Sequence, residues 1–103
     1  MTTNDMDRTV VLAKVLQSEL ISSLGKDVGI LNVGVVVMDK EEEGGSIDFT
    51  VDALGGGTLH ALVELSKESF ISLMSHYLPR ARLVDGLSKM FAAPMRATIT
   101  VTL

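Results

Sequence analysis

Two segments in which apolar and polar residues strictly alternate constrain the fold of this chain more than any other feature. The first alternates polar residues with Ile47, Phe49, Val51 and Ala53, and the second does so with Leu59, Ala61, Val63 and Leu65. Successive side chains of a strand point to opposite faces of a sheet, so this pattern sets one face against a core and the other in water. We therefore predict two half-exposed β-strands.

A third strand is predicted at residues 30–38, which are rich in β-branched side chains and apolar at both odd and even positions. This composition is typical of a strand that is buried, at least partly, on both faces. A charged loop at residues 39–43 and two following glycines predict a turn that joins it to the next strand. The register that keeps apolar residues together pairs Val37 with Ile47, Val35 with Phe49 and Val33 with Val51.

The second hairpin joins the two alternating segments, and its register is less constrained. We expect Ala53 to face Leu59. On the polar face, Asp52 then faces His60 and Asp48 faces Glu64. A shift by two residues preserves the alternation, so these exact pairs stay open, whereas the shared outer face does not depend on them.

Helices are predicted on either side of this meander. Asn4 is a suitable N-cap for a helix over residues 5–24, whose apolar stripe is wider than one sheet face usually covers. Two explanations are weighed equally: packing between the sheet and another helix, or an oligomer interface. Ser66 caps a second helix over residues 67–78, which Pro79 ends and which we expect to lie on the apolar face of the sheet.

The C-terminal part is harder to interpret. We predict a short helix at residues 83–92 that Pro94 breaks, with a short strand at residues 80–84 as the alternative. Residues 96–103 alternate again and predict a last strand. Since residues 30–38 look the most buried, we place this strand beside them.

These elements predict one α+β domain over residues 1–103. Its architecture is a two-layer sandwich with a four-stranded, mainly antiparallel sheet in the order 4-1-2-3 and with helices on one face. The topology is α-β-β-β-α-(α)-β, in which the bracketed helix is the uncertain element at residues 80–95. A chain of 103 residues is large enough for one hydrophobic core.

Charge and composition narrow the function classes. A formal net charge of −4 argues against direct binding to nucleic acid or to anionic membrane surfaces. The chain has no cysteine, which excludes disulfides, thiol catalysis and cysteine zinc sites. No segment resembles a signal peptide or a membrane span, so we expect a cytoplasmic protein. No cofactor motif is found, and no cofactor is expected.

The first candidate site is the polar face of the sheet, which collects Asp48, Asp52, His60 and Glu64, with Thr98, Thr100 and Thr102 expected nearby. Carboxylates and a histidine suit a hard divalent cation or acid–base chemistry. Like charges that face each other across strands are destabilising unless something neutralises them. The more common explanation is a solvated face, which antiparallel sheets usually have, and we favour it. Which metal would bind is not specified.

The second candidate site contains Arg80 and Arg82, close to His76 and Tyr77 at the end of the second predicted helix. Two arginines in this position could hold a carboxylate or a phosphate. We favour the simpler explanation that cations are stabilising at a helix C-terminus.

No motif is specific enough to name a reaction. The leading hypothesis is a small, non-enzymatic binding or interaction protein that acts as a homo-oligomer. The first alternative is an acidic inhibitor or decoy that blocks a basic, nucleic-acid-binding partner through residues 39–43 and the acidic sheet face. The second alternative is a small metal-assisted or acid–base enzyme that uses Asp48, Asp52, His60 and Glu64.

Overall fold

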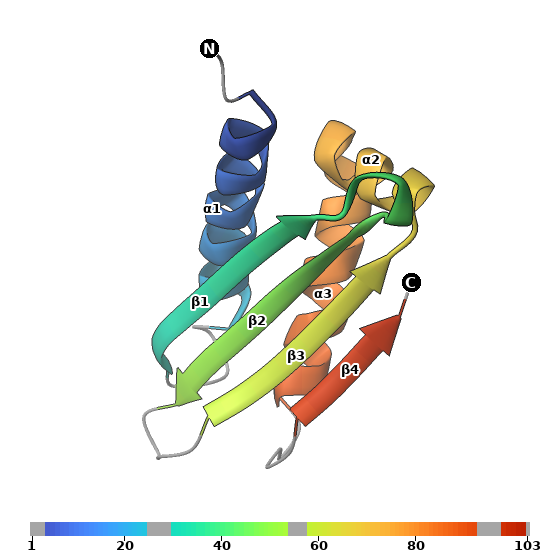
Figure 1. Cartoon of the computed structure of the whole chain (residues 1–103). Coiled ribbons are helices and arrows are strands. Elements are labelled where there is room, and N and C mark those ends of the chain that lie inside the picture. The colour runs from blue at the N-terminus through green and yellow to red at the C-terminus, as the bar shows by residue number, and fades with distance from the viewer. Residues whose placement is uncertain (1–3, 25–29, 54–57, 93–97, 103) are drawn as a thin grey trace.

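A computed structural model describes residues 4–24, 30–53, 58–92 and 98–102, and it shows an α+β protein (Figure 1). The elements in chain order are α1 (Asn4–Leu24), β1 (Ile30–Asp39), the short 3-10 helix η1 (Glu41–Glu43), β2 (Gly45–Ala53), β3 (Thr58–Leu65), α2 (Lys67–Ser75), α3 (Tyr77–Ala92) and β4 (Thr98–Thr102). The helices α1 and α3 lie behind the sheet in Figure 1, and α2 lies at one end of it.

The first three strands form the predicted antiparallel meander. In the first hairpin the register is the expected one: Val37 opposite Ile47, Val35 opposite Phe49, and Val33 opposite Val51. The polar residues of β2 and β3 are half-buried or exposed, while these alternating apolar residues are buried: Ile47, Phe49, Val51, Leu59, Ala61, Val63 and Leu65. Burial of this apolar face, at roughly 25 cal/mol per Å², is the main force that holds the two layers together.

The second hairpin has a different register from the expected one. Val51 rather than Ala53 pairs with Leu59, and as a result Thr50 faces His60, Asp48 faces Leu62, and Ser46 faces Glu64. The expected pairs of Asp52 with His60 and of Asp48 with Glu64 are therefore wrong by two residues. Such a shift leaves every side chain on its own face, which is why alternation alone did not exclude it.

The predicted strand order 4-1-2-3 is also wrong. The order is β1-β2-β3-β4, and β4 runs parallel to β3, so β1 is an edge strand instead of an interior one. The physical reason is the connection: the chain leaves β3, passes through α2 and α3, and returns along the sheet. A helical crossover of this kind brings the next strand in parallel beside the first.

Helix α1 packs on the sheet behind β1 and beside α3. Its fully buried stripe consists of leucines at a spacing of four residues: Leu12, Leu16, Leu20 and Leu24. Part of the wide apolar surface of α1 packs against α3, which agrees with the first of the two explanations, packing between the sheet and another helix. Val10, Val11 and Ile21 stay exposed. The expected helix stop at Gly25 and Lys26 lies outside the described residues.

The helical region after β3 differs from the prediction in its boundaries. The second helix ends at Ser75 instead of Leu78, and α3 begins at Tyr77, so Pro79 lies in the first turn of a helix rather than at the end of one. Proline is tolerated there because the first N–H groups of a helix have no acceptor within it. The alternative strand at residues 80–84 is thus wrong. The expected break at Pro94 lies outside the described residues.

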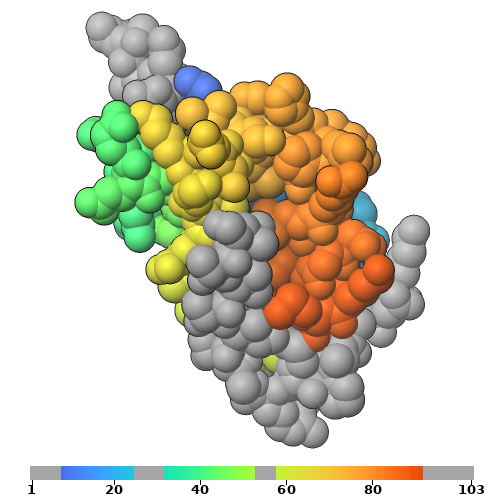
Figure 2. Space-filling model, turned by 90° about the vertical axis from the view of Figure 1, so that its right-hand side faces the viewer, coloured from blue at the N-terminus to red at the C-terminus, as the bar shows by residue number. Residues whose placement is uncertain are grey.

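These boundaries decide which helix covers the core. Phe70 and Leu73 of α2 are buried, and the ring of Phe70 packs closely on Gly45 at the start of β2. Viewed from the side of β4, α2 lies next to the turn between β1 and β2, and α3 extends below it (Figure 2). The helix α2 therefore covers the end of the sheet, while the side chains of α3, including Leu87 and Phe91, complete the core.

Candidate functional site

The outer face of the sheet brings Asp48 and His60 into contact. The register places His60 of β3 opposite Thr50, one step diagonally from Asp48 of β2, and His60 Nε2 meets Asp48 Oδ1. Their side chains are 44% and 37% exposed for the aspartate and the histidine, respectively. Diagonal neighbours on one sheet face are within reach of long side chains, so this pair follows from the register.

The other two predicted residues of this face stand apart from that pair. Asp52 accepts a hydrogen bond of 3.0 Å from the hydroxyl of Thr58. Glu64 is exposed and lies opposite Ser46. Since Asp48 faces Leu62, the like-charge opposition that motivated a bound cation is absent. Within residues 4–24, 30–53, 58–92 and 98–102, no three histidine, aspartate or glutamate side chains form a group that could hold a metal ion.

The backbone of β4 runs beside this face, with Thr98 opposite His60, Thr100 opposite Leu62 and Thr102 opposite Glu64. The side chains of these threonines lie outside the described part of the chain. Their expected contribution to the polar face therefore stays a prediction.

The two arginines of the second candidate site do not converge. Both belong to the first half of α3, not to the end of α2, and residues two apart on a helix point in different directions. Arg80 is half-buried, and its Nη1 donates a hydrogen bond of 3.3 Å to the carbonyl oxygen of Leu73 in the last turn of α2. Arg82 is exposed. Arg80 thus satisfies a carbonyl at a helix end, which is a structural role.

The acidic turn after β1 is a folded element with internal partners. The backbone N–H of Glu41 donates to Asp39 Oδ1 at 2.8 Å, and Lys67 Nζ at the start of α2 lies 2.8 Å from Glu42 Oε2. The hydrogen bond with Glu42 raises the pKa of Lys67 above its ordinary value, and the nearby carboxylates of Asp39 and Glu41 act in the same direction. Part of the negative charge of this turn is therefore already compensated.

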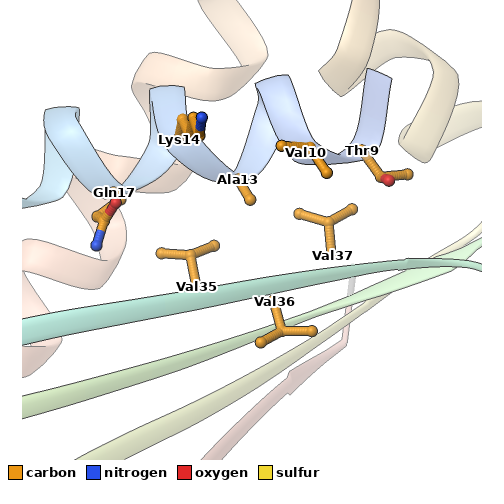
Figure 3. Close-up of a pocket in the computed structure, with 8 residues that line it drawn as sticks. All are labelled: Thr9, Val10, Ala13, Lys14, Gln17, Val35, Val36 and Val37. Atoms are coloured by element: carbon orange, nitrogen blue, oxygen red, sulfur yellow. The ribbon is translucent and has the colours of Figure 1, made fainter. Parts of the chain in front are cut away.

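Sequence reasoning missed a groove between α1 and β1. It has a volume of about 320 Å³, and its lining residues are Thr9, Val10, Ala13, Lys14 and Gln17 of α1 with Val35, Val36 and Val37 of β1. Figure 3 shows Val35 and Val37 pointing toward the helix, while Val36 points to the opposite side of the sheet. The sequence did indicate this groove, because β1 is apolar at both odd and even positions. We had attributed that pattern to an interior strand.

The backbone of β1 is free along this groove. Lys40 N–H donates to the Gly44 carbonyl, so the even-numbered residues of β1 exchange hydrogen bonds with β2. In an antiparallel pair the alternate residues direct both backbone groups away from that neighbour. Consistent with this, the carbonyl of Val33 accepts a bond of 2.6 Å from Gln17 Nε2. The N–H and C=O groups of Val35 and Val37 consequently point outward, and no described residue bonds to them.

Exposed apolar side chains surround this free edge. Val36 is 63% exposed and Met38 is 54% exposed on the outer face of β1, and Val10 of α1 is 47% exposed beside the groove. Long, apolar edge strands are uncommon at a free surface, because natural proteins protect them with charges, prolines or bulges. In β1 the only charged residue is Asp39 at its end, and the irregularity in its pairing lies between Ile30 and Asn32. We define Val10, Val35, Val36, Val37 and Met38 as the β1 edge surface.

A second hollow of about 340 Å³ lies on the surface between the neighbouring helices α1 and α3. Its lining residues are Ser18, Glu19, Ser22, Ser23, Tyr77, Ala81, Val84 and Asp85. One oxygen of the Glu19 carboxylate is buried without a hydrogen-bond partner. The hollow is open and more polar than the β1 groove, and Asp85 is paired with Lys89 at 3.1 Å.

Comparisons with known proteins add no family to this description. No protein-family model, curated protein or solved structure matches the chain. Among the described helices, none combines the length and the apolar character that crossing a membrane requires. The function must accordingly be argued from the surface of this chain alone.

Proposed function

We propose that this protein is a non-enzymatic interaction protein that acts as a homo-oligomer, and that the β1 edge surface is the part through which it binds. The observation that carries this proposal is a conflict between sequence and position. Residues 30–38 have the composition of an interior strand, but β1 lies at the edge of the sheet with Val36 and Met38 exposed. A partner that covers the edge would resolve the conflict.

The chemistry of the surface supports association rather than catalysis. Its side chains are aliphatic or thioether groups, which contribute to binding through burial and not through proton transfer. The free backbone donors and acceptors of Val35 and Val37 would in addition fix the orientation of a bound partner relative to β1. An extended partner strand can satisfy them, as it does whenever a strand is added to the edge of a sheet.

Analytical ultracentrifugation tests the proposal directly. We expect the sedimenting mass to rise with protein concentration from 11.0 kDa, the mass of one chain, toward a multiple of it. Added salt should leave the association unchanged or strengthen it, because apolar burial is not screened. A mass of one chain at every concentration up to about 0.5 mM would count against a homo-oligomer. Association that weakens steeply with salt would favour a contact through the acidic turn instead.

A further inference from the structure

We propose that two copies of this chain pair through their β1 strands, antiparallel, with Val36 of one copy directly opposite Val36 of the other. The two four-stranded sheets then form one continuous sheet across a two-fold axis. This inference rests on the proposed function, since it specifies the partner and the register of the same surface.

The backbone groups of β1 select this register. A two-fold axis at Val36 pairs Val35 with Val37 of the second copy, and Val37 with Val35. Each pair exchanges two hydrogen bonds, so all the outward groups of these two residues are satisfied. The Val33 carbonyl already accepts from Gln17; an axis at Val36 places it opposite Asp39 at the end of the strand, whereas an axis at Val35 would place it opposite Val37 and leave the Val37 N–H without an acceptor. An axis at Val37 would pair Val33 with Glu41, which lies beyond the end of β1, and would therefore shorten the paired segment.

The outer-face side chains are self-complementary in this register. The two Val36 side chains meet at the centre, where the Cα atoms of a non-hydrogen-bonded pair lie about 4.5 Å apart. Met38 comes opposite Gly34 of the second copy. A Cβ on Gly34 would meet only the Cβ of Thr50 at 4.0 Å, so there is open space above this glycine. The exposed Met38 side chain can occupy that space.

The inner side of the pairing completes the groove. Val35 and Val37 face α1, and in the dimer each lies beside the other residue of the second copy, which adds apolar surface next to Val10. Asp39 comes opposite Val33, whose carbonyl accepts from Gln17 at that end of the groove. No two like charges face each other across the new pair.

Cysteine cross-linking tests the register. Because the chain has no native cysteine, only the introduced cysteines can form disulfides. Val36→Cys places two thiols on Cα atoms about 4.5 Å apart, within the span of about 4.4–6.8 Å that a disulfide needs. We expect it to form a covalent dimer under mild oxidation. The matched control is Met38→Cys, whose two copies lie more than about 13 Å apart and should not cross-link alone. Mixed with Gly34→Cys chains, Met38→Cys chains should form a disulfide between unlike chains.

A steric variant tests the same contact without covalent chemistry. Gly34→Arg has room in the single chain but fills the space that Met38 of the second copy needs, so we expect the dimer dissociation constant to rise at least about tenfold. Thr58→Arg adds the same charge on the outer face of β3, two strands from the edge, and should leave the constant unchanged. Circular dichroism of both variants checks that the chain still folds.

The outcomes separate this inference from the proposed function. A concentration-dependent dimer that Val36→Cys fails to cross-link, or that Gly34→Arg fails to weaken, would overturn the β1 pairing and leave self-association standing. Equal cross-linking by Val36→Cys and Met38→Cys would overturn the register. A single-chain mass at all concentrations would overturn both proposals and leave the edge to a strand from a different protein.

Discussion

Gly44 closes the turn between β1 and β2, and its conformation admits no other residue easily. Its φ of 93° lies in the left-handed region, and a Cβ added there would meet the carbonyl oxygen of Leu65 at 2.0 Å. The neighbouring backbone belongs to the junction of β3 and α2, where the Ser66 hydroxyl accepts the N–H of Ser69 as an N-cap. Because Gly44 has no side chain, the backbone of the turn can pack directly against the backbone at the start of α2.

Replacing this glycine should therefore cost stability. We expect Gly44→Ala to lower the free energy of unfolding by more than about 2 kcal/mol, from left-handed strain and the backbone clash together. Gly86→Ala is the matched control: no atom lies within 4 Å of the added Cβ, and alanine is the better helix former, so a gain of about 0.5–1 kcal/mol is expected. Urea denaturation measures both. Equal effects of the two substitutions would contradict this view of Gly44.

The pair of Lys67 and Glu42 gives a second prediction for single residues. Glu42→Gln should bring the pKa of Lys67 down toward its ordinary value, because the hydrogen bond with Glu42 is the largest cause of its rise. Glu43→Gln is the control and should leave the pKa raised. Since the folded-state pKa lies above the unfolded one, the stabilisation by this pair is complete at neutral pH. It is lost as the pH rises through the raised pKa of the folded state. Nitrogen NMR of the Lys67 ammonium group follows the titration.

At the scale of elements, the junction of α2 and α3 depends on Arg80. The two helices are separated by His76 alone, and the α2 carbonyls at this end need donors. Arg80 supplies one by reaching from the first turns of α3 back to Leu73. A residue that we had first considered as an anion ligand therefore links two helices through a hydrogen bond, and only the position at which α3 begins reveals this role.

Removing this donor should loosen the end of α2. We expect Arg80→Met, which keeps the apolar stem, to lower the free energy of unfolding by about 0.5–1.5 kcal/mol and to accelerate amide exchange in the last turn of α2. Arg82→Met changes an exposed side chain of the same helix and should stay within about 0.5 kcal/mol of the parent chain. Unchanged exchange in α2 after Arg80→Met would show that the hydrogen bond contributes nothing.

At the scale of the whole molecule, the free edge of β1 distinguishes one copy from two. In the single chain the N–H groups of Gly34 and Val36 face β2, while those of Val35 and Val37 face outward. Pairing with a second copy protects the outward set and leaves the inward set as it was. The inward amides of Gly34 and Val36 therefore serve as an internal control for the outward amides of Val35 and Val37.

Hydrogen exchange at two protein concentrations should show this difference. We expect the amides of Val35 and Val37 to exchange rapidly in dilute solution and to become protected as the concentration rises, while those of Gly34 and Val36 stay protected throughout. Gly34→Arg should abolish the concentration dependence. Amides of Val35 and Val37 that exchange rapidly at every concentration would rule out pairing at this edge.

Comparison with the sequence shows where local patterns sufficed and where they did not. The alternation around Phe49 and Ala61 predicted which face of each strand is buried, and the short charged turn predicted the first register. The same alternation could not distinguish the two registers of the second hairpin, so the contact of Asp48 with His60 was missed. The apolar outer residues of β1 were noticed but assigned to burial within one chain.

The sequence by itself determined the parity of every strand of the meander, because side chains alternate between faces whatever the strands pair with. Only the tertiary structure decided the order of the strands, because that depends on the path of the chain. The return through α2 and α3 carries β4 to the far side of β3 and leaves β1 paired on one side only, with β2. The sequence thus determines that the outer face of β1 is apolar, whereas the helical crossover determines that this face is exposed.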